Sequence, residues 1–278
     1  MKKISRRSFM AAAAVSVAAL AMTACGGSAS SAASSVASSA ASSEAVSSAA
    51  AAELTTVEAG KLTMATNAAF PPYEMTTDAG EFEGIDVDTA KAIAEKLGLE
   101  LQIDDMDFDA ALLSVQQGKA DIVMAGVTVT DERKAVMDFS DSYATGIQSI
   151  IVPNDSDIAS PDDLAGKKIG TQRGTTGYIY CSDDFGDENV VAYDDGLTAV
   201  QALNNGQVDA VVIDNAPAQE FVAANPGLKV LDTSYAEEDY AIGMAKGSAL
   251  EDAINAALEE LKADGTLQSI VDKYITAE

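Results

Sequence analysis

Two stretches of ten residues, 115–124 and 203–212, align with each other without a gap. Each has the pattern of a helix end, a glycine that stops the helix, and a short buried strand. Upstream of both lies an apolar helix stripe, and further upstream a strand that feeds a loop. The repeat predicts two lobes of about 90 residues each, rich in strand–helix units. The rival interpretation is a chance match, because helix–glycine–strand loops recur in α/β proteins.

Strand and helix signals alternate along the first of these lobes. The strand signals are period-2 alternation or a short apolar run, and the helix signals are apolar side chains at helical spacing followed by glycine. The strands are predicted at 61–66, 99–103 and 120–124, and the helices at 86–97 and 108–115. This alternation predicts an α/β fold in which each lobe is a mainly parallel sheet flanked by helices.

Two extended stretches connect the predicted lobes. Residues 148–153 form an extended run that ends in proline, and a second extended stretch, 231–242, precedes a helix at 249–263. A pair of crossing strands of this kind makes a hinge, with a cleft between the lobes where the carboxyl ends of the strands meet. The predicted lobes are 61–149 with 240–278, and 150–239.

The first 24 residues have the pattern of an export signal. Four cations in the first seven residues precede an apolar run, 10–21, that is too short to span a bilayer. The run leads into Ala-Met-Thr-Ala-Cys, which resembles a bacterial lipobox and predicts that Cys25 is lipidated. An ordinary signal peptide with an incidental cysteine is the alternative. The Arg6-Arg7 pair leaves open whether export follows the general or the twin-arginine route.

Residues 25–60 are predicted to be a disordered tether. From 26 to 52 the chain is almost entirely Ser and Ala, with no apolar stripe to bury. As a flexible coil the tether would span about 30 Å, which suits a domain held near a membrane. Cys181 is the only other thiol, so a lipidated Cys25 leaves it without a disulfide partner.

Composition excludes several classes of function. The chain has 17 Lys and Arg against 44 Asp and Glu, and removal of the export signal would leave 13 cations. Such a charge argues against nucleic acid as a partner. The chain has no histidine, which removes Ser-His and Cys-His nucleophile pairs and every His metal ligand.

Motif searches indicate no enzyme active site. The chain lacks a G-x-S-x-G motif, a Walker phosphate loop and a G-x-G-x-x-G loop after a strand. The acidic runs 104–109 and 183–188 lack the ligand spacing of an EF-hand and are interpreted as solvated surface. Neither a metal nor a cofactor is therefore expected, and no residue is assigned a catalytic role.

Polar side chains gather instead in loops at predicted strand ends. These loops are 66–74, 106–109, 125–133 and 213–215, and a Gly-Thr-Thr-Gly turn opens a helix at 174–177. The run Ala-Gly-Val-Thr-Val-Thr-Asp-Glu-Arg at 125–133 resembles the solute-binding proteins of family 3, the receptors of amino-acid ABC transporters. This resemblance implies a periplasmic-binding-protein fold of two lobes on a two-strand hinge. It also implies a free amino acid as ligand, and an ABC permease with its ATPase as partners.

An amino acid presents a carboxylate and an ammonium at fixed separation, so its receptor needs a bidentate arginine and an opposing carboxylate. The resemblance assigns these roles to Arg133 in one lobe and Asp214 in the other. It adds the Thr128 N–H and hydroxyl and the Thr176 N–H for the carboxylate, and the Gly126 carbonyl for the ammonium. The other expected ligand-binding residues are Asn67, Phe70, Phe108, Ala125, Gln172 and Thr175.

Each assignment has a structural alternative. Arg133 could be an exposed first-turn residue after an N-cap at Thr130, and Asp214 could itself be an N-cap. Phe70 and Phe108 could belong to the ordinary core rather than to the ligand site. Tyr73 is interpreted as structural.

The residues expected around the ligand side chain are neutral. Asn67 stands where many members with cationic ligands carry Asp, Ala125 replaces a serine of some members, and Gln172 is also neutral. Because a buried cation needs a counter-charge, these residues favour a polar uncharged side chain. Arg173 would favour an anion instead.

The sequence therefore predicts a monomeric, lipid-tethered receptor on the outer face of the cell membrane. Its lobes would close over an amino acid, and the closed form would dock on a permease. Two alternatives stay open. One is a ligand sensor for a signalling partner, and the other is a lyase that resembles the cyclohexadienyl dehydratases of this fold.

Overall fold

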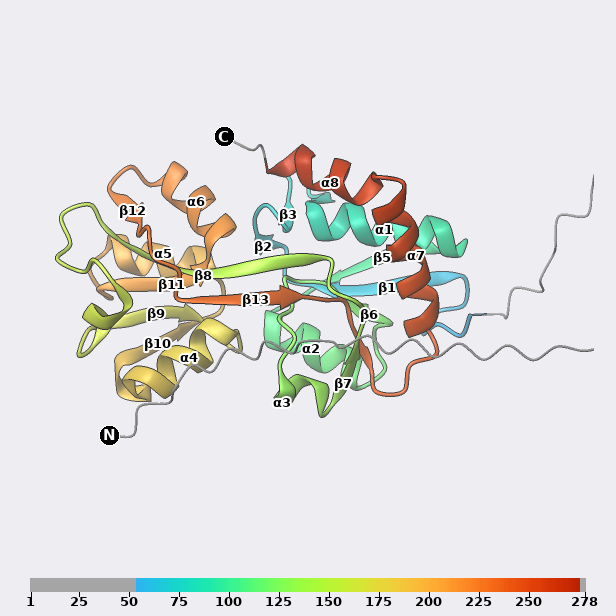
Figure 1. The fold of residues 1–278 in the computed structure, drawn as a ribbon, viewed down its shortest axis with the longest axis horizontal. Coiled ribbons are helices and arrows are strands. Elements are labelled where there is room, and N and C mark those ends of the chain that lie inside the picture. The colour runs from blue at the N-terminus through green and yellow to red at the C-terminus, as the bar shows by residue number, and fades with distance from the viewer. Residues whose placement is uncertain (1–53, 276–278) are drawn as a thin grey trace, which may run out of the picture. The chain divides into compact units, whose positions relative to one another are not determined.

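The computed structural model describes residues 54–275 (Figure 1). The expected export signal, Cys25 and residues 26–53 of the expected tether lie outside the described residues. Within 54–275, no helix has both the length and the apolar character needed to cross a membrane.

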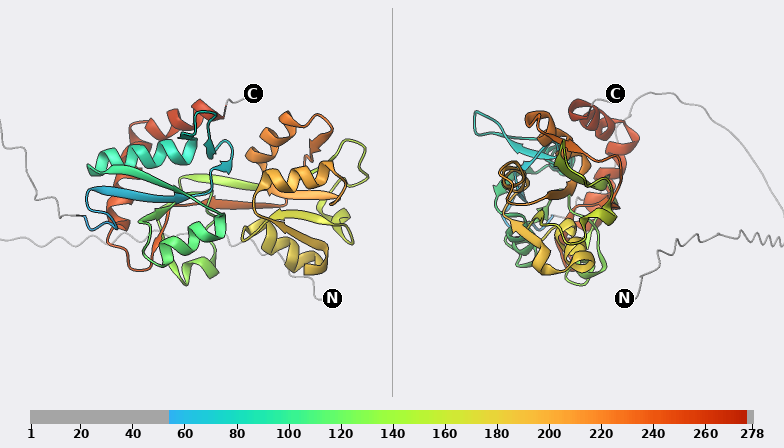
Figure 2. Two further views of the ribbon diagram at one scale, coloured as in Figure 1. Left: turned by 180° about the vertical axis from the view of Figure 1, so that it is seen from behind. Right: turned by 90° about the vertical axis from the view of Figure 1, so that its left-hand side faces the viewer.

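The first sheet has five strands in the order β5-β1-β6-β14-β7. One of its faces is covered by α1, α7 and α8, which pack together, and the other by α2 (Figure 2). The strands are β1 (Lys61–Thr66), β5 (Glu100–Asp105), β6 (Ile122–Val123), β7 (Met137–Phe139) and β14 (Gly243–Ala245). The helices are α1 (Ile85–Leu97), α2 (Phe108–Gln116), α3 (Asp131–Lys134), α7 (Glu251–Ala263) and α8 (Thr266–Tyr274). A small separate sheet contains β2 (Ala69–Phe70), β3 (Glu74–Thr76) and β4 (Phe82–Glu83).

The second sheet has the order β10-β9-β11-β8-β12, with β13 also paired to β8. Its faces are covered by α5 and α6 on one side and by α4 on the other (Figure 2). The strands are β8 (Ala144–Pro153), β9 (Ile169–Gln172), β10 (Val190–Tyr193), β11 (Ala210–Asp214), β12 (Leu228–Val230) and β13 (Ala236–Tyr240). The helices are α4 (Thr176–Phe185), α5 (Gly196–Asn204) and α6 (Asn215–Ala224), with 3-10 turns at Pro161–Leu164 and Asp187–Asn189.

Both sheets are mixed. The strands joined through helices pair in parallel, as predicted: β5-β1-β6 in the first sheet and β10-β9-β11 in the second. The antiparallel pairs come from β8, β12 and β13 in the second sheet and from β14 in the first. Of these strands, β8 carries the chain from the first lobe to the second and β13 carries it back in the opposite direction.

The internal repeat is present in the structure as two matching turns. Gly118 after α2 and Gly206 after α5 have φ angles of 67° and 66°, in the left-handed region that glycine adopts without strain. The Gly118 N–H donates to the Val115 carbonyl at 2.9 Å, and the Gly206 N–H donates to the Leu203 carbonyl at 3.0 Å. The prediction of two related lobes is confirmed at this level of backbone geometry.

The aspartate that follows each turn has the same function in both lobes. The Asp121 carboxylate accepts the Thr63 N–H at 2.8 Å, and the Asp209 carboxylate accepts the Lys168 N–H at 2.7 Å. Each carboxylate fixes the start of the strand beside it. A chance match between the two sequence stretches does not account for this equivalence.

Helix α1 illustrates how the apolar stripes set the core. Val87, Ala90, Ile93 and Ala94 are buried, and Gly98 ends the helix with a φ of 69°. The prediction of one last helix at 249–263 was incomplete, because α8 follows α7 after a single turn. The sequence does contain a signal for α8, namely apolar side chains at helical spacing. They are Leu267, Ile270, Val271 and Tyr274, and all four pack against the core.

The predicted crossing strands are β8 and β13, which pair antiparallel over five residues, with Gly146 opposite Glu238. The ring of Tyr240 lies against Gly146 so closely that a Cβ atom there would be 2.4 Å from the ring atom Cζ. Since Tyr240 is fully buried, the ring has no free space into which to move. A residue without a side chain is therefore required at this point of the hinge.

We expect Gly146→Ala to lower the free energy of unfolding by about 1–3 kcal/mol, the usual cost of overpacking a filled interior. Urea denaturation measures the change. Gly227→Ala is the matched control, because a Cβ at Gly227 meets nothing within 4 Å and its φ lies outside the left-handed region. Equal stability of the two variants would contradict the steric argument.

Candidate functional site

A cavity lies where the carboxyl ends of β1, β6, β9 and β11 meet. The space between its lining atoms, including the part that is open to solvent, is about 310 Å³. All eleven residues expected to bind ligand line this cavity, together with Glu74, which the sequence analysis missed. The lining residues are Asn67, Phe70, Glu74, Phe108, Ala125, Gly126, Thr128, Arg133, Gln172, Thr175, Thr176 and Asp214.

Arg133 combines the two roles that the sequence left open. Its backbone N–H is capped by the Thr130 hydroxyl at 3.2 Å, so it is a first-turn residue of α3. Its side chain is buried rather than exposed, and the guanidinium donates to the Thr128 carbonyl at 2.7 Å and the Gly174 carbonyl at 3.2 Å. The guanidinium also lies over the Phe108 ring, 5.4 Å from its centre. These contacts hold the cation at the cavity wall.

The guanidinium of Arg133 has no ionic partner within residues 54–275, where none of the ion pairs closer than 4.0 Å involves it. Burial lowers the pKa of Arg133, whereas the charges of Glu238 and Asp214 raise it. A buried cation is costly unless an anion compensates its charge. The site is therefore suited to an anionic group on a ligand.

Asp214 lies at the end of β11 and at the N-cap position of α6, but its side chain makes no capping hydrogen bond. One carboxylate oxygen accepts the Gln148 Nε2–H at 2.8 Å, and the other accepts the Tyr240 hydroxyl. Burial raises the pKa of Asp214 to about 7, against the lowering effect of the Tyr240 hydrogen bond, and the charge of Glu238 raises it further. The alternative role as an N-cap is wrong for this side chain.

Direct contacts between the two lobes close the cavity. The Gln172 Nε2–H donates to Asn67 Oδ1 at 2.8 Å, and the hydroxyl oxygens of Thr128 and Thr176 lie 3.4 Å apart. The Arg133 bond to Gly174 also connects the lobes. The structure thus brings both halves of the expected site together in one closed arrangement.

The hydroxyl of Thr128 does not have the role expected for it. It donates to a carboxylate oxygen of Glu238 at 3.1 Å, and the Thr176 hydroxyl donates to the same oxygen at 2.9 Å. A hydroxyl has one hydrogen to donate, so neither hydroxyl has a hydrogen left for an anion in the cavity. Thr175 has a separate task, since its side chain caps α4 by accepting the Tyr178 N–H at 3.3 Å.

Phe70 and Phe108 are both buried, and both line the cavity as well as the core. The two interpretations offered for them are therefore compatible. Tyr73 packs against Phe70 at 5.9 Å between ring centres and edge-on against Tyr240 at 5.3 Å. Its interpretation as a structural residue agrees with this packing.

Gly126 allows close approach to the backbone at the cavity wall. Its φ is 55°, and a Cβ there would lie 2.9 Å from the Phe70 ring. The Gly126 N–H donates to a carboxylate oxygen of Asp86 at 3.0 Å, which fixes the peptide. With Ala125 beside it, this segment presents backbone rather than side chains to the cavity.

Glu74 is fully buried, and both of its carboxyl oxygens lack a hydrogen-bond partner among the described residues. Burial raises the pKa of Glu74 well above its ordinary value, and the nearby charge of Asp86 adds to the effect. Burial also raises the pKa of Asp86, to about 6. The sequence signal for Glu74 is an acidic residue directly after the Phe-Pro-Pro-Tyr turn at 70–73.

Arg173 lies outside the cavity, although it follows the lining residue Gln172. Its side chain is exposed and forms an ion pair with Asp194 at 3.3 Å. The suggestion that it draws an anionic ligand side chain is not supported by this position. Within residues 54–275, no group of three or more acidic or cysteine side chains is arranged to hold a metal.

Comparisons with known proteins agree with the fold. Residues 62–277 match the family model of bacterial extracellular solute-binding proteins, family 3. The L-cystine-binding protein TcyJ of Escherichia coli K12 is 32% identical over 225 residues, which are 80% of this chain and 85% of that protein.

Two solved structures are similar over nearly their whole length. The arginine-, lysine-, histidine-binding protein ArtJ from the thermophilic bacterium Geobacillus stearothermophilus has a TM-score of 0.75 and 34% identity, covering 78% of this chain and 96% of ArtJ. An ancestral arginine-binding protein bound to glutamine has a TM-score of 0.75 and 42% identity, covering 78% of this chain and 99% of that protein. The expected two-lobed fold class is confirmed.

Proposed function

This chain belongs to family 3 of the bacterial extracellular solute-binding proteins of amino-acid ABC transporters, and we propose that it holds its amino acid between Arg133 and Asp214. The observation that carries the proposal is the buried Arg133 guanidinium at the cavity wall, without a carboxylate within 4.0 Å among residues 54–275. The α-carboxylate of the ligand supplies the missing anion. The relatives named above are binding proteins, which favours a receptor over the lyase alternative.

The α-ammonium is proposed to bind the Asp214 carboxylate. The Gly126 carbonyl of the first lobe accepts from the same ammonium. At the ligand carboxylate, the Thr128 N–H of the first lobe and the Thr176 N–H of the second lobe add to Arg133. The amino end of α4 supports this, because helix N-termini favour anions. Every amino acid shares these two groups, so this part of the site sets affinity and not side-chain preference.

We propose a cationic side chain, a guanidinium or ammonium, as the preferred ligand class. Support comes from Glu74, a carboxyl at 0% exposure that lines the cavity beside another acid, Asp86, and forms no ion pair within residues 54–275. A bound cation would provide the counter-charge that this buried group lacks. Arginine and lysine are also named for the similar protein ArtJ.

A polar uncharged side chain, the preference expected from the sequence, is the second candidate. Asn67 and Gln172 both line the cavity, and both have neutral amide side chains. They hydrogen-bond directly to each other. Support comes from the similar ancestral arginine-binding protein, which is bound to glutamine, an amino acid with an amide side chain. The two candidates differ in whether Glu74 binds as a carboxylate or as a neutral acid.

The finer features of location and assembly are also part of the proposal. A lipid at Cys25 anchors the receptor to the outer face of the cell membrane. The tether was expected to reach residue 60, but Leu54 packs against the core and the Val57 N–H donates to Asp121 at 2.7 Å, so the proposed tether ends at residue 53. Lobe 1 consists of 61–149 with 240–278, and lobe 2 of 150–239. The receptor is a monomer, and its closed form docks on the permease that works with an ATPase.

A thermal-shift panel tests the proposed function. Residues 50–278 are unfolded and refolded to strip ligand and are then screened against the common amino acids and cystine. A ligand at about 1,000 times its dissociation constant adds about 4 kcal/mol, or roughly 8–16 °C in Tm. Shifts with arginine or lysine support the cationic class, and shifts with glutamine alone support the polar class. Absence of any shift would refute amino-acid binding.

Affinity is expected to weaken as the pH falls, because the ligand ammonium needs the ionised form of Asp214. With a pKa of about 7 in the empty site, Asp214 is mostly ionised at pH 8 and mostly protonated at pH 6. Bound ammonium lowers this pKa, so binding at pH 6 must release a proton, and Kd should be about tenfold weaker there. Calorimetry at both pH values measures the change, and equal Kd values would contradict the role of Asp214.

A further inference from the structure

Glu238 is a buried carboxylate in the crossing strand β13 that does not line the cavity. One of its oxygens accepts three hydrogen bonds. The donors are the Thr176 hydroxyl at 2.9 Å, the Gln148 Nε2–H at 3.0 Å and the Thr128 hydroxyl at 3.1 Å. Hydrogen bonds to a charged acceptor are stronger than neutral ones, so this oxygen is a strong common anchor.

The two hydroxyl donors come from opposite lobes. Thr128 follows β6 in the first lobe, and Thr176 is the first residue of α4 in the second. Both can reach the same oxygen only while the lobes are together, with their hydroxyl oxygens 3.4 Å apart. If the lobes separate, at least one of these hydrogen bonds is broken.

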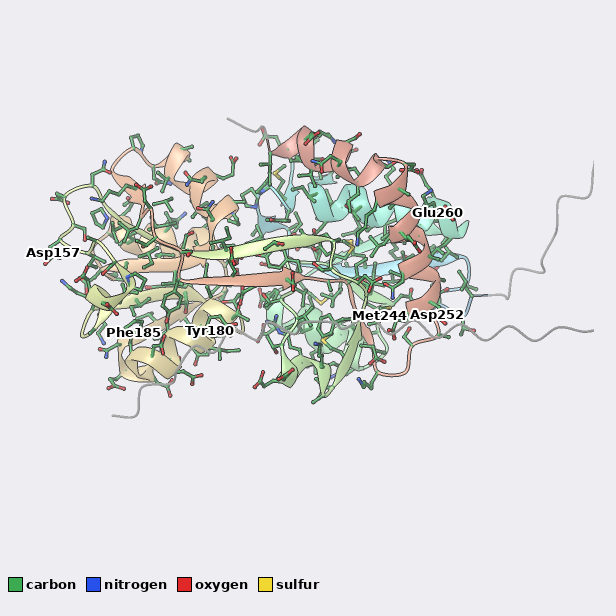
Figure 3. All side chains as sticks on the ribbon, viewed as in Figure 1. Asp157, Tyr180, Phe185, Met244, Asp252 and Glu260 are labelled. Atoms are coloured by element: carbon green, nitrogen blue, oxygen red, sulfur yellow. The ribbon has the colours of Figure 1, made fainter. Side chains whose placement is uncertain are left out.

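The charge of Glu238 acts on residues at and around the cavity. Gln148 donates to both Glu238 and Asp214, so it connects this carboxylate to the proposed ammonium anchor. Tyr180 extends from α4 (labelled in Figure 3), and burial together with the charge of Glu238 raises its pKa to about 12. The charge of Glu238 also raises the pKa of Arg133.

We infer that Glu238 is a positioning residue that favours closure of the two lobes by holding Thr128 and Thr176 on one carboxylate oxygen. None of these contacts needs a ligand, so the latch acts in the empty receptor as well as in the loaded one. The inference deepens the proposed function and rests on it for the ligand. Because apparent affinity depends on the population of the closed state, the latch strengthens the binding of all ligands equally.

The test uses the full chain with Cys25→Ser and spin labels at Gln116→Cys in α2 and Asp183→Cys in α4. Both labelled positions are exposed, they lie in different lobes, and Cys181 is buried. Pulsed dipolar spectroscopy then gives the label-to-label distance distribution without ligand and with saturating arginine. The variants compared are Glu238→Gln and the control Glu237→Gln, which removes the same charge from an exposed neighbour in the same strand.

We expect Glu238→Gln to shift the ligand-free distribution toward longer distances and to weaken Kd by about tenfold for every amino acid that binds. Glu237→Gln should match the parent in both measurements. Unchanged distances in Glu238→Gln, or a Kd within about twofold of the control, would overturn the inference. If Glu238→Gln does not fold, Glu238→Asp replaces it, because the shorter acid keeps the charge but withdraws the oxygen from the hydroxyls.

A double-mutant cycle separates the latch from general damage. Thr176→Val removes the hydroxyl at nearly constant shape, and its effect on the ligand-free distribution should disappear in the Glu238→Gln background. Additive effects of the two changes would overturn the inference. These distance measurements decide the latch even if no amino acid binds the parent chain, in which case only the proposed function fails.

Discussion

Arg133→Ala is expected to weaken the binding of every amino acid by at least about 100-fold, because it removes the buried cation that pairs with the ligand carboxylate. The loss should be the same for all side chains, since each ligand uses the same α-carboxylate. Calorimetric titration of two chemically different ligands measures this. A loss confined to one ligand would place Arg133 in the side-chain pocket instead.

Two variants control for this experiment. Arg173→Ala removes an exposed arginine, paired with Asp194 on the surface, and should leave binding unchanged. Arg133→Lys keeps the charge but loses the planar fork, and we expect binding that is weaker than in the parent and stronger than in Arg133→Ala. Parental affinity in Arg133→Ala would refute the anchor.

Glu74→Gln is expected to weaken arginine by about 30-fold or more and to leave glutamine within about threefold of the parent. The substitution keeps the shape of a fully buried side chain and removes only its ability to become an anion. A guanidinium would then be buried without a counter-charge, whereas an amide would still find hydrogen-bonding groups. Titration of both ligands into both proteins gives the ratio directly.

Glu81→Gln provides the comparison, since Glu81 is an exposed acid close to Glu74 in the sequence, between β3 and β4. It removes one negative charge without changing the cavity. If Glu74→Gln and Glu81→Gln bind arginine equally well, the carboxyl of Glu74 does not recognise the ligand side chain. The preference would then rest on Asn67 and Gln172, and the polar uncharged class would be favoured.

The sequence predicted most of the fold because its local signals are strong. Helix stripes such as that of α1 and glycine stops such as Gly98 are set by neighbouring residues in the chain. The repeat at 115–124 and 203–212 predicted the lobes because each copy encodes the same turn and the same strand anchor. The antiparallel strand pairs were harder to predict from the sequence, because they depend on where distant segments such as β14 enter the sheet.

The same division between local and distant information applies to the site. Loops at strand ends, together with the resemblance to family 3, predicted eleven lining residues, and the carboxyl ends of parallel strands do meet at one edge. Glu74 and Glu238 were not predicted. Both residues are important because they are buried, and Glu238 also has hydrogen-bond partners more than 60 residues away in the sequence. A local sequence pattern reveals neither the burial nor the distant partners. The Thr128 hydroxyl was expected to bind the ligand carboxylate, but it donates its hydrogen to Glu238, which is distant in the sequence.

In the proposed site, Arg133 binds the α-carboxylate of the ligand and Asp214 binds its α-ammonium. The most direct test is calorimetric titration of the stripped protein with L-arginine and with agmatine, which is arginine without the α-carboxylate. L-arginine is expected to bind, and agmatine is expected to bind at least about 100-fold more weakly, because only arginine supplies the anion for Arg133. If glutamine is the better ligand, its decarboxylated amine takes the place of agmatine. Equal binding of an amino acid and its decarboxylated amine would contradict the pairing of the ligand α-carboxylate with Arg133.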